Sequence, residues 1–162
     1  MRKISSSTTR HTYVRPHMEY CVQAWSPHLV KGIQILESVQ RTATRMISTL
    51  NKLPYKSRLH RLGLTMLERR RIRVDLIETF KLLTRIEKVD MEQFFELNDT
   101  GYNLRGHSKR LTVNRCRLDC RKYFLSNTVV HHWNDLPQEI VDAWSVNVIK
   151  NRLDRHWQDM GI

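Results

Sequence analysis

The side chains that could bind a metal ion or act as nucleophiles are few in this chain of 162 residues. The possible zinc ligands are Cys116, Cys120, His131 and His132. Their spacing matches no common zinc signature, so packed thiols and surface histidines are the simpler interpretation. Cys21 lies near His17 and His28, but no pattern that would orient a thiol and an imidazole accompanies them. We therefore expect no metal site and no cofactor.

The carboxylates are also arranged without a catalytic pattern. Nucleotidyl transfer by two metal ions needs Asp residues that converge on the ions, usually including neighbours on a tight turn. The chain has no Asp-Asp pair, and it lacks a Gly-rich phosphate loop, a Gly-x-Ser-x-Gly turn and a His-Glu-x-x-His helix. The sequence therefore predicts no catalytic residue, and we expect the isolated chain not to be an enzyme.

Positive charge is the strongest chemical signal in the sequence. The formal net charge is +12 and the pI is near 10.1, which favours a polyanion as partner. Residues 51–73 hold eight basic residues and one acidic residue, and residues 102–122 hold seven and one, whereas residues 74–99 hold three and seven. The same pattern would arise if these were only solvated faces, or if they once faced another domain.

Contacts to phosphate need only cations along a helix face or loop, because they position nucleic acid without reading its sequence. The candidate residues come from the first helical region and from both basic blocks. They are Arg41, Arg45, Lys56, Arg58, Arg61, Arg69, Arg70, Arg71, Arg73, Arg105, Lys109, Arg110, Arg115, Arg117, Arg121 and Lys122. The expected partner is RNA or DNA duplex, bound largely without sequence preference.

Helices joined by short turns must position these cations. A first helix is expected after 25–27, and its apolar face carries Leu29, Ile33, Leu36, Ala43, Ile47 and Leu50. Its opposite face carries Lys31, Gln34, Ser38, Arg41 and Arg45. Glu37 lies one turn before Arg41 and is expected to pair with it. A brief helix is predicted over 56–62, ahead of Gly63.

A second long helix is predicted from the capping box at Thr65 to Glu68 as far as about Lys88. A loop or short hairpin follows near 98–118, with a short strand at 111–113, and a further helix covers 121–133 until 134–137 breaks it. Ser145 is expected to cap the last helix. The residues expected to be buried are Trp25, Leu36, Phe80, Phe124, Trp133 and Trp157.

Several segments, taken in order, resemble one known family. The first two read YVRPHMEYCVQAWSP over 13–27 and LESVQRTAT over 36–44. The others are Tyr55 to Leu59, Arg61 to Leu64, Leu67 to Arg71, Asp75 to Ile77, Phe80 to Leu82, Trp133 to Pro137, and Val146 through Lys150 to Leu153 and on to Trp157. Together they resemble the region that follows the polymerase palm in LINE-type (non-LTR) retrotransposon reverse transcriptases, in particular the jockey-like branch. The resemblance covers nearly all of 13–162.

The resemblance implies a mainly α fold, with a thumb-like helical bundle over 13–97, a basic loop or hairpin over 98–120 and a C-terminal helical extension over 121–162. Residues 1–12 diverge from the family and are expected to be disordered. The palm, with its Tyr/Phe-x-Asp-Asp turn, and the upstream endonuclease are not present in the sequence. Thr128 stands where the family tends to carry Arg, which puts one contact of the family in doubt.

The resemblance therefore implies a non-catalytic C-terminal fragment of an RNA-directed DNA polymerase that helps to hold the template-primer duplex, with the missing palm domain as a further partner. The alternative is a helical module for protein interaction or self-association, with no role in nucleic-acid binding. No apolar run is long enough to span a membrane and no secretory signal precedes the helices, so we expect an intracellular protein, nuclear or cytoplasmic. The oligomeric state stays open.

Overall fold

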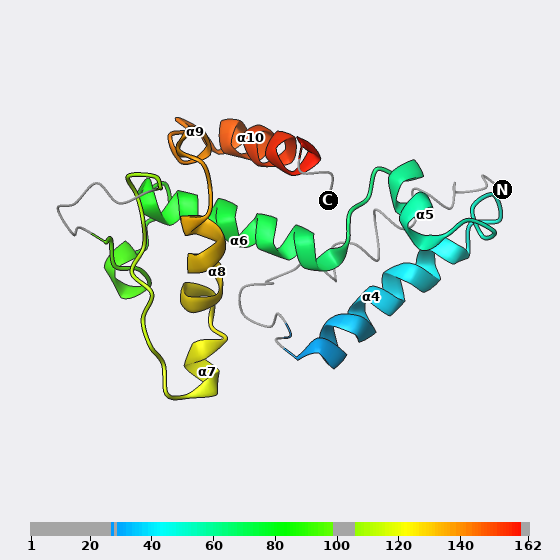
Figure 1. The fold of residues 1–162 in the computed structure, drawn as a ribbon, viewed down its shortest axis with the longest axis horizontal. Coiled ribbons are helices and arrows are strands. Elements are labelled where there is room, and N and C mark those ends of the chain that lie inside the picture. Colours follow the sequence, from blue (N-terminus) through cyan, green and yellow to red (C-terminus); the bar gives the residue numbers. More distant parts are fainter. Residues whose placement is uncertain (1–26, 28, 99–105, 160–162) are drawn as a thin grey trace. The chain divides into compact units, whose positions relative to one another are not determined.

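The computed structural model describes residues 27, 29–98 and 106–159, and these are mainly helical, as predicted (Figure 1). The chain divides into two compact units, Met1–Arg71 and Ile72–Ile162, which we call unit 1 and unit 2. The predictions made for Trp25, for Arg105 and for residues 1–12 lie outside the described residues.

Unit 1 contains helix α4 (Val30–Arg45), helix α5 (Tyr55–Arg61) and the first residues of helix α6 (Leu67–Leu83). Helix α5 agrees with the brief helix predicted there. Gly63 ends it with a φ of 61°, while the N–H of Leu64 donates to the carbonyl of Leu59 over 2.9 Å. This left-handed residue is the usual way to close a helix, and glycine adopts it without steric cost.

The apolar face predicted for the first helix is half-buried at Ile33, Leu36, Ala43 and Ile47, buried at Leu50 and exposed at Leu29. The buried residues of α4 are Gln40 and Thr44, whereas Leu36 is only half-buried. Ile35 is 56% exposed and Val39 is 43% exposed. Within the described residues, α4 is therefore most deeply buried at two polar side chains, and Ile35 and Val39 lie outside the face that was predicted. The opposite polar face is exposed as predicted at all five positions.

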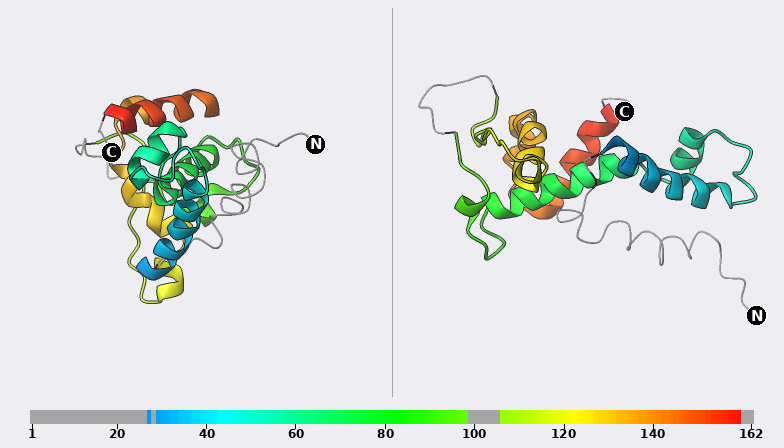
Figure 2. Two further views of the ribbon diagram at one scale, coloured as in Figure 1. Left: turned by 90° about the vertical axis from the view of Figure 1, so that its right-hand side faces the viewer. Right: turned by 90° about the horizontal axis from the view of Figure 1, so that it is seen from below.

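Unit 2 contains the rest of α6, the short 3-10 helix η2 (Met91–Gln93), and the helices α7 (Asp119–Lys122), α8 (Leu125–Asn134), α9 (Gln138–Val141) and α10 (Val146–Asp159). Figures 1 and 2 show α8 lying across α6. One apolar core joins α6, α8, α9 and α10, and it includes Leu76, Ile77, Phe80, Val129, Val130, Trp133, Ile140, Val141, Ile149 and Leu153. The predicted burial of Phe80 and Trp133 is confirmed, and Trp157 is partly buried against this core.

Helix α6 ends at Leu83. The prediction that it continues to about Lys88 is wrong. Arg85 adopts a φ of 54°, and the N–H of Ile86 donates to the carbonyl of Lys81 over 3.0 Å. This is the hydrogen bond of a Schellman motif, which closes a helix with one left-handed residue. Because that residue is an arginine here, the sequence lacks the glycine that would mark the end.

The single helix predicted over 121–133 is two helices, α7 and α8. Phe124 separates them with an extended backbone (φ −73°, ψ 152°), and the side chain of Asn127 donates to the carbonyl of Arg121 over 2.5 Å. This bond satisfies a carbonyl at the end of α7, where the chain leaves the helix. The burial predicted for Phe124 is consequently wrong, since its side chain is 45% exposed.

The strand predicted at 111–113 is reduced to one antiparallel bridge between Leu97 and Leu111. The N–H of Thr112 donates to the carbonyl of Glu96, and the N–H of Asn98 donates to that of Arg110, both over 2.8 Å. Figures 1 and 2 show the two segments running side by side at this point. In the described part of the chain, no longer ladder follows from this bridge.

The end of α8 and the start of α10 agree with the predictions, whereas the short helix α9 was not predicted. Helix α8 ends at Asn134, and Pro137 precedes the first residue of α9. Ser145 caps α10, because its hydroxyl oxygen accepts a hydrogen bond of 3.3 Å from the N–H of Val148.

A buried histidine joins the 106–111 segment to α8. The ring nitrogen Nε2 of His107 lies 2.8 Å from the carbonyl oxygen of Trp133, and Nδ1 accepts the N–H of Lys109 over 3.2 Å. These contacts fix the neutral tautomer, with the proton on Nε2. Burial lowers the pKa of His107 below its ordinary value of 6.5, and the nearby Arg110 lowers it further, against the hydrogen bond to Trp133, which raises it.

Candidate nucleic-acid interface

The net positive charge of the chain belongs almost entirely to unit 1, although Lys and Arg are equally numerous in the two units. Residues 1–71 contain 14 Lys and Arg against three Asp and Glu, which is an excess of 11. Residues 72–162 contain 14 against 13, an excess of one, and the two together give the net charge of +12. Unit 1 is therefore the part of the chain whose electrostatic field would attract a polyanion over a distance.

Two polar side chains of α4 hold the basic elements of unit 1 in place. Glu37 accepts a hydrogen bond from the hydroxyl of Tyr55 and another, of 3.0 Å, from the N–H of Leu67. Gln40 donates to the Tyr55 oxygen over 3.0 Å and to the carbonyl of Thr65 over 3.1 Å, and its own oxygen accepts a bond from Arg70. The starts of α5 and α6 are thus both fixed to α4.

Two local contacts predicted for this region, the capping box that begins at Thr65 and the pair between Glu37 and Arg41, are replaced by other contacts. Helix α6 begins at Leu67, so Thr65 lies before the capping position, and Glu37 satisfies a free N–H of the first turn from another helix. Instead of an ion pair with Glu37, Arg41 places its guanidinium 5.0 Å from the ring centre of Tyr55. The cationic face of α4 therefore reaches the start of α5.

Tyr55 acts as a neutral hydrogen-bond donor at this junction. Burial raises the pKa of Tyr55 above its ordinary value of 10.0, and its hydrogen bond to the Glu37 carboxylate raises the pKa further. Arg58 lies on the same ring at 5.6 Å and is 6% exposed. Its guanidinium donates to the carbonyl of Leu53 over 3.1 Å, so Arg58 holds the turn before α5.

The cations on α4 form one exposed line. Arg41 and Arg45 are one helical turn apart and exposed, as predicted. Lys31 lies on the same face, ten residues before Arg41, and is also exposed; it belonged to the predicted polar face but not to the candidate contacts. From Lys31 to Arg45 the helix rises about 21 Å, which is the length of about six nucleotides of a duplex strand. The helical spacing between Lys31 and Arg41 was sufficient to predict Lys31 as a further contact residue.

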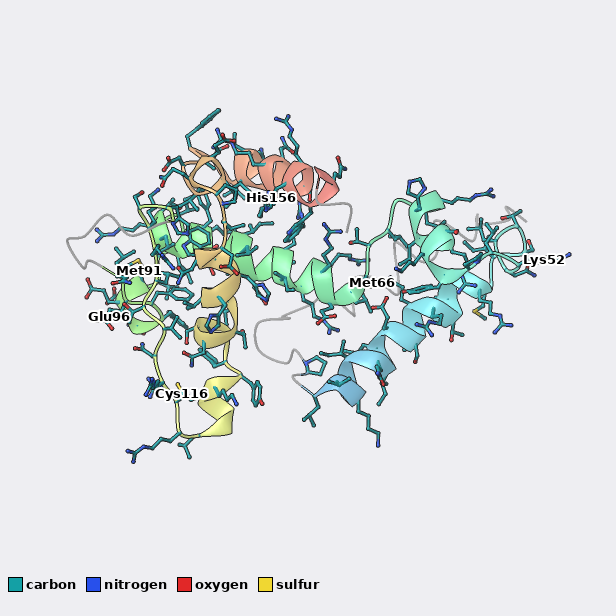
Figure 3. The ribbon with its side chains drawn as sticks, in the orientation of Figure 1. Lys52, Met66, Met91, Glu96, Cys116 and His156 are labelled. Carbon is teal, nitrogen blue, oxygen red and sulfur yellow. The ribbon has the colours of Figure 1, made fainter. Side chains whose placement is uncertain are left out.

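Helix α5 and the loop before it add further exposed cations. Lys56 lies in the first turn of α5 and Arg61 at its end, both exposed as the phosphate-binding hypothesis requires. Lys52 extends from the loop between α4 and α5 (Figure 3) and is exposed too. Within the described residues, the side chains of Lys52, Lys56 and Arg61 make no ion pair.

The arginine cluster at 69–73 is mostly engaged within the protein. Arg71 is only 5% exposed, and Arg69 and Arg70 are half-buried. In unit 2, Arg73 forms a bidentate ion pair with Asp154, with N–O distances of 2.7 and 2.8 Å. A buried or paired guanidinium would have to leave its site to reach a phosphate. Arg58, Arg71 and Arg73 are therefore held by the protein and do not belong to its exposed cationic surface.

The second basic block is divided between packed and exposed residues. Lys109 and Arg110 are half-buried, and the ammonium of Lys109 lies 3.5 Å from the carbonyl oxygen of Val141. Four cations of this block are exposed, and they are Arg115, Arg117, Arg121 and Lys122. All four belong to unit 2, where Arg115, Arg117 and Arg121 line a cleft.

Neither a metal centre nor a membrane span occurs among the described residues. No three His, Cys, Asp or Glu side chains gather there as possible metal ligands. Cys116 is a free thiol, and its sulfur accepts a hydrogen bond of 3.2 Å from the side chain of Asn127. No helix in this part of the chain has the length and apolar character needed to cross a membrane.

Comparison with known proteins found no matching family model, no matching curated protein and no matching solved structure. The resemblance to LINE-type reverse transcriptases therefore stays a prediction from the sequence.

Proposed function

We propose that this chain is a non-catalytic C-terminal segment of a LINE-type RNA-directed DNA polymerase and that unit 1 binds template-primer duplex through phosphate contacts. The observation that carries the proposal is the excess of 11 positive charges in residues 1–71, with cations exposed along α4 and α5. The proposed contact residues are Lys31, Arg41, Arg45, Lys56 and Arg61.

These contacts would position a duplex without reading its bases. Lys and Arg side chains bind phosphates whatever the base sequence, and such contacts carry no sequence information. On the resemblance we also propose the missing palm domain as a further partner. We propose an intracellular location, nuclear or cytoplasmic. Since the chain carries no Asp-Asp pair, we expect no primer extension by the isolated chain with Mg²⁺ or Mn²⁺.

The test is a fluorescence anisotropy titration of a labelled RNA–DNA hybrid duplex with the 162-residue chain at several salt concentrations. With five phosphate contacts, the logarithm of affinity should fall against the logarithm of salt with a slope of about −4.5. In R45Q/K56Q/R61Q the slope should flatten by about 2.7. These three side chains make no hydrogen bond or ion pair within the described residues, so helicity should be unchanged.

A matched control removes the same charge from unit 2. Arg85, Lys88 and Arg155 are exposed and make no ion pair within the described residues. R85Q/K88Q/R155Q should therefore keep most of the slope. Equal flattening in both triple variants would mean that binding follows net charge alone, and a folded chain that does not bind duplex at low salt would contradict the proposal.

A second candidate function is protein interaction through α4. Ile35, Val39 and Met46 are exposed to 56%, 43% and 80%, and their spacing of four and seven residues places them along one line. Apolar association of this kind persists at high salt, whereas binding to phosphate weakens steeply. Sedimentation equilibrium at low and high salt, with Val39→Gln as the variant, separates the two functions.

A further inference from the structure

Unit 2 contains a cleft of about 850 Å³, which is within the usual range for ligand sites. One wall consists of η2 and the residues that follow it, up to Leu97. The other wall consists of 114–118 with residues of α7 and α8. Figure 3 labels Glu96 on the first segment and Cys116 on the second, and both line the cleft.

The two walls carry opposite charges. Glu92 and Glu96 line the first wall, and the second carries Arg115, Arg117 and Arg121. All five side chains are exposed, and the ion pairs of the described residues are formed by other side chains. The cleft therefore keeps cations and carboxylates apart. A ligand that fits the cleft has anionic groups that face the arginines and hydrogen-bond donors that face the two glutamates.

Aromatic rings lie next to the basic wall. Phe94 lines the cleft and stacks on Phe124, with 6.4 Å between the ring centres and 14° between the planes. Phe124 is 45% exposed and Tyr123 is 39% exposed, and the Lys122 ammonium lies 5.4 Å from the ring centre of Tyr123. Cations beside exposed rings are the arrangement that binds unpaired nucleotides, because phosphates follow the cations while bases stack on the rings.

We propose that this cleft binds a single strand of nucleic acid. Its phosphates lie along the three arginines, amino groups of bases donate to Glu92 and Glu96, and a base stacks on Phe124, which lies beside the cleft against Phe94. A duplex is disfavoured, because its second phosphate backbone would lie against the carboxylates of the acidic wall. This site shares no residue with the duplex contact proposed for unit 1, so either can fail while the other stands.

Anisotropy titration of the full chain with a short labelled oligo(dC) tests the site. Phe124→Ala should weaken binding by about 5- to 150-fold, the range for one stacked base. R115Q/R117Q should flatten the salt slope by about 1.4, since single strands release fewer counterions per contact. The unit 1 variant R45Q/K56Q/R61Q should retain most of the affinity for oligo(dC).

The acidic wall gives the sharpest test. In the R45Q/K56Q/R61Q background, where duplex binding by unit 1 is weakened, adding E92Q/E96Q should reduce the preference for single strand over duplex. An unchanged preference overturns the role of the acidic wall. If oligo(dC) binding is lost in the unit 1 variant but kept in both Phe124→Ala and R115Q/R117Q, the cleft is not the site, while the function proposed for unit 1 stands.

Discussion

The carboxylate of Glu37 should stabilise unit 1 by about 2–4 kcal/mol, and Glu37→Ala measures this. The change leaves the N–H of Leu67 without its acceptor in a residue that is 2% exposed, which costs about 1–3 kcal/mol. The lost bond from Tyr55 adds about 1 kcal/mol. Glu37→Gln keeps one acceptor oxygen and should lose about half as much.

Native-state hydrogen exchange followed by NMR is the appropriate assay, because it reports on unit 1 separately from unit 2. The amide of Leu67 should exchange at least about thirtyfold faster in Glu37→Ala. Glu68→Ala is the matched control, since it removes the same charge from the first turn of α6 and should cost only about 0.3–1 kcal/mol. Equal acceleration in the two variants would refute the capping role of Glu37.

Three further predictions concern unit 2. The pKa of His107 is lowered in the folded state, so the contribution of neutral His107 to stability is present above pH 6.5 and is lost as the pH falls below 6.5. The urea midpoint should therefore fall with pH in this range. In His107→Gln this pH dependence should be absent. Asp154→Asn breaks the bidentate pair with Arg73 and should cost about 0.2–1 kcal/mol in urea unfolding, less at high salt. Ser145→Ala removes the cap of α10 and should lower the free energy of unfolding by about 1 kcal/mol; an unchanged midpoint would show that the cap contributes nothing.

The helical class and much of the core could be predicted from the sequence. Apolar spacing found the positions of α4, α6, α8 and α10, and it found the burial of Phe80 and Trp133, because local periodicity decides which face of a helix is apolar. Ser145 was found as a cap because its hydroxyl acts on its own helix, three residues away. Features that depend on neighbouring residues alone are therefore well predicted.

Contacts between distant residues could not be predicted in the same way. The bond from Leu67 to Glu37 joins residues 30 positions apart, and no local pattern announces it. The break at Phe124 depends on a side chain that reaches back from Asn127, and the end of α6 depends on an arginine in a backbone conformation that favours glycine. The burial of Arg58 and Arg71 could not be predicted from the sequence either, because an arginine in a basic block has the same neighbours in sequence whether it is packed or exposed.

The two units are stabilised in different ways, and this difference bears on the proposed function. The described part of unit 1 buries few apolar side chains, namely Leu50, Leu59 and Leu67. It relies on the hydrogen bonds of Glu37 and Gln40. The apolar core cluster, in contrast, lies in unit 2. Its excess of positive charge opposes the compact state by self-repulsion. In the proposed function a bound duplex neutralises that repulsion, so binding and folding of unit 1 reinforce each other by linkage. Unit 2, with nearly balanced charge, has no comparable repulsion for a ligand to neutralise.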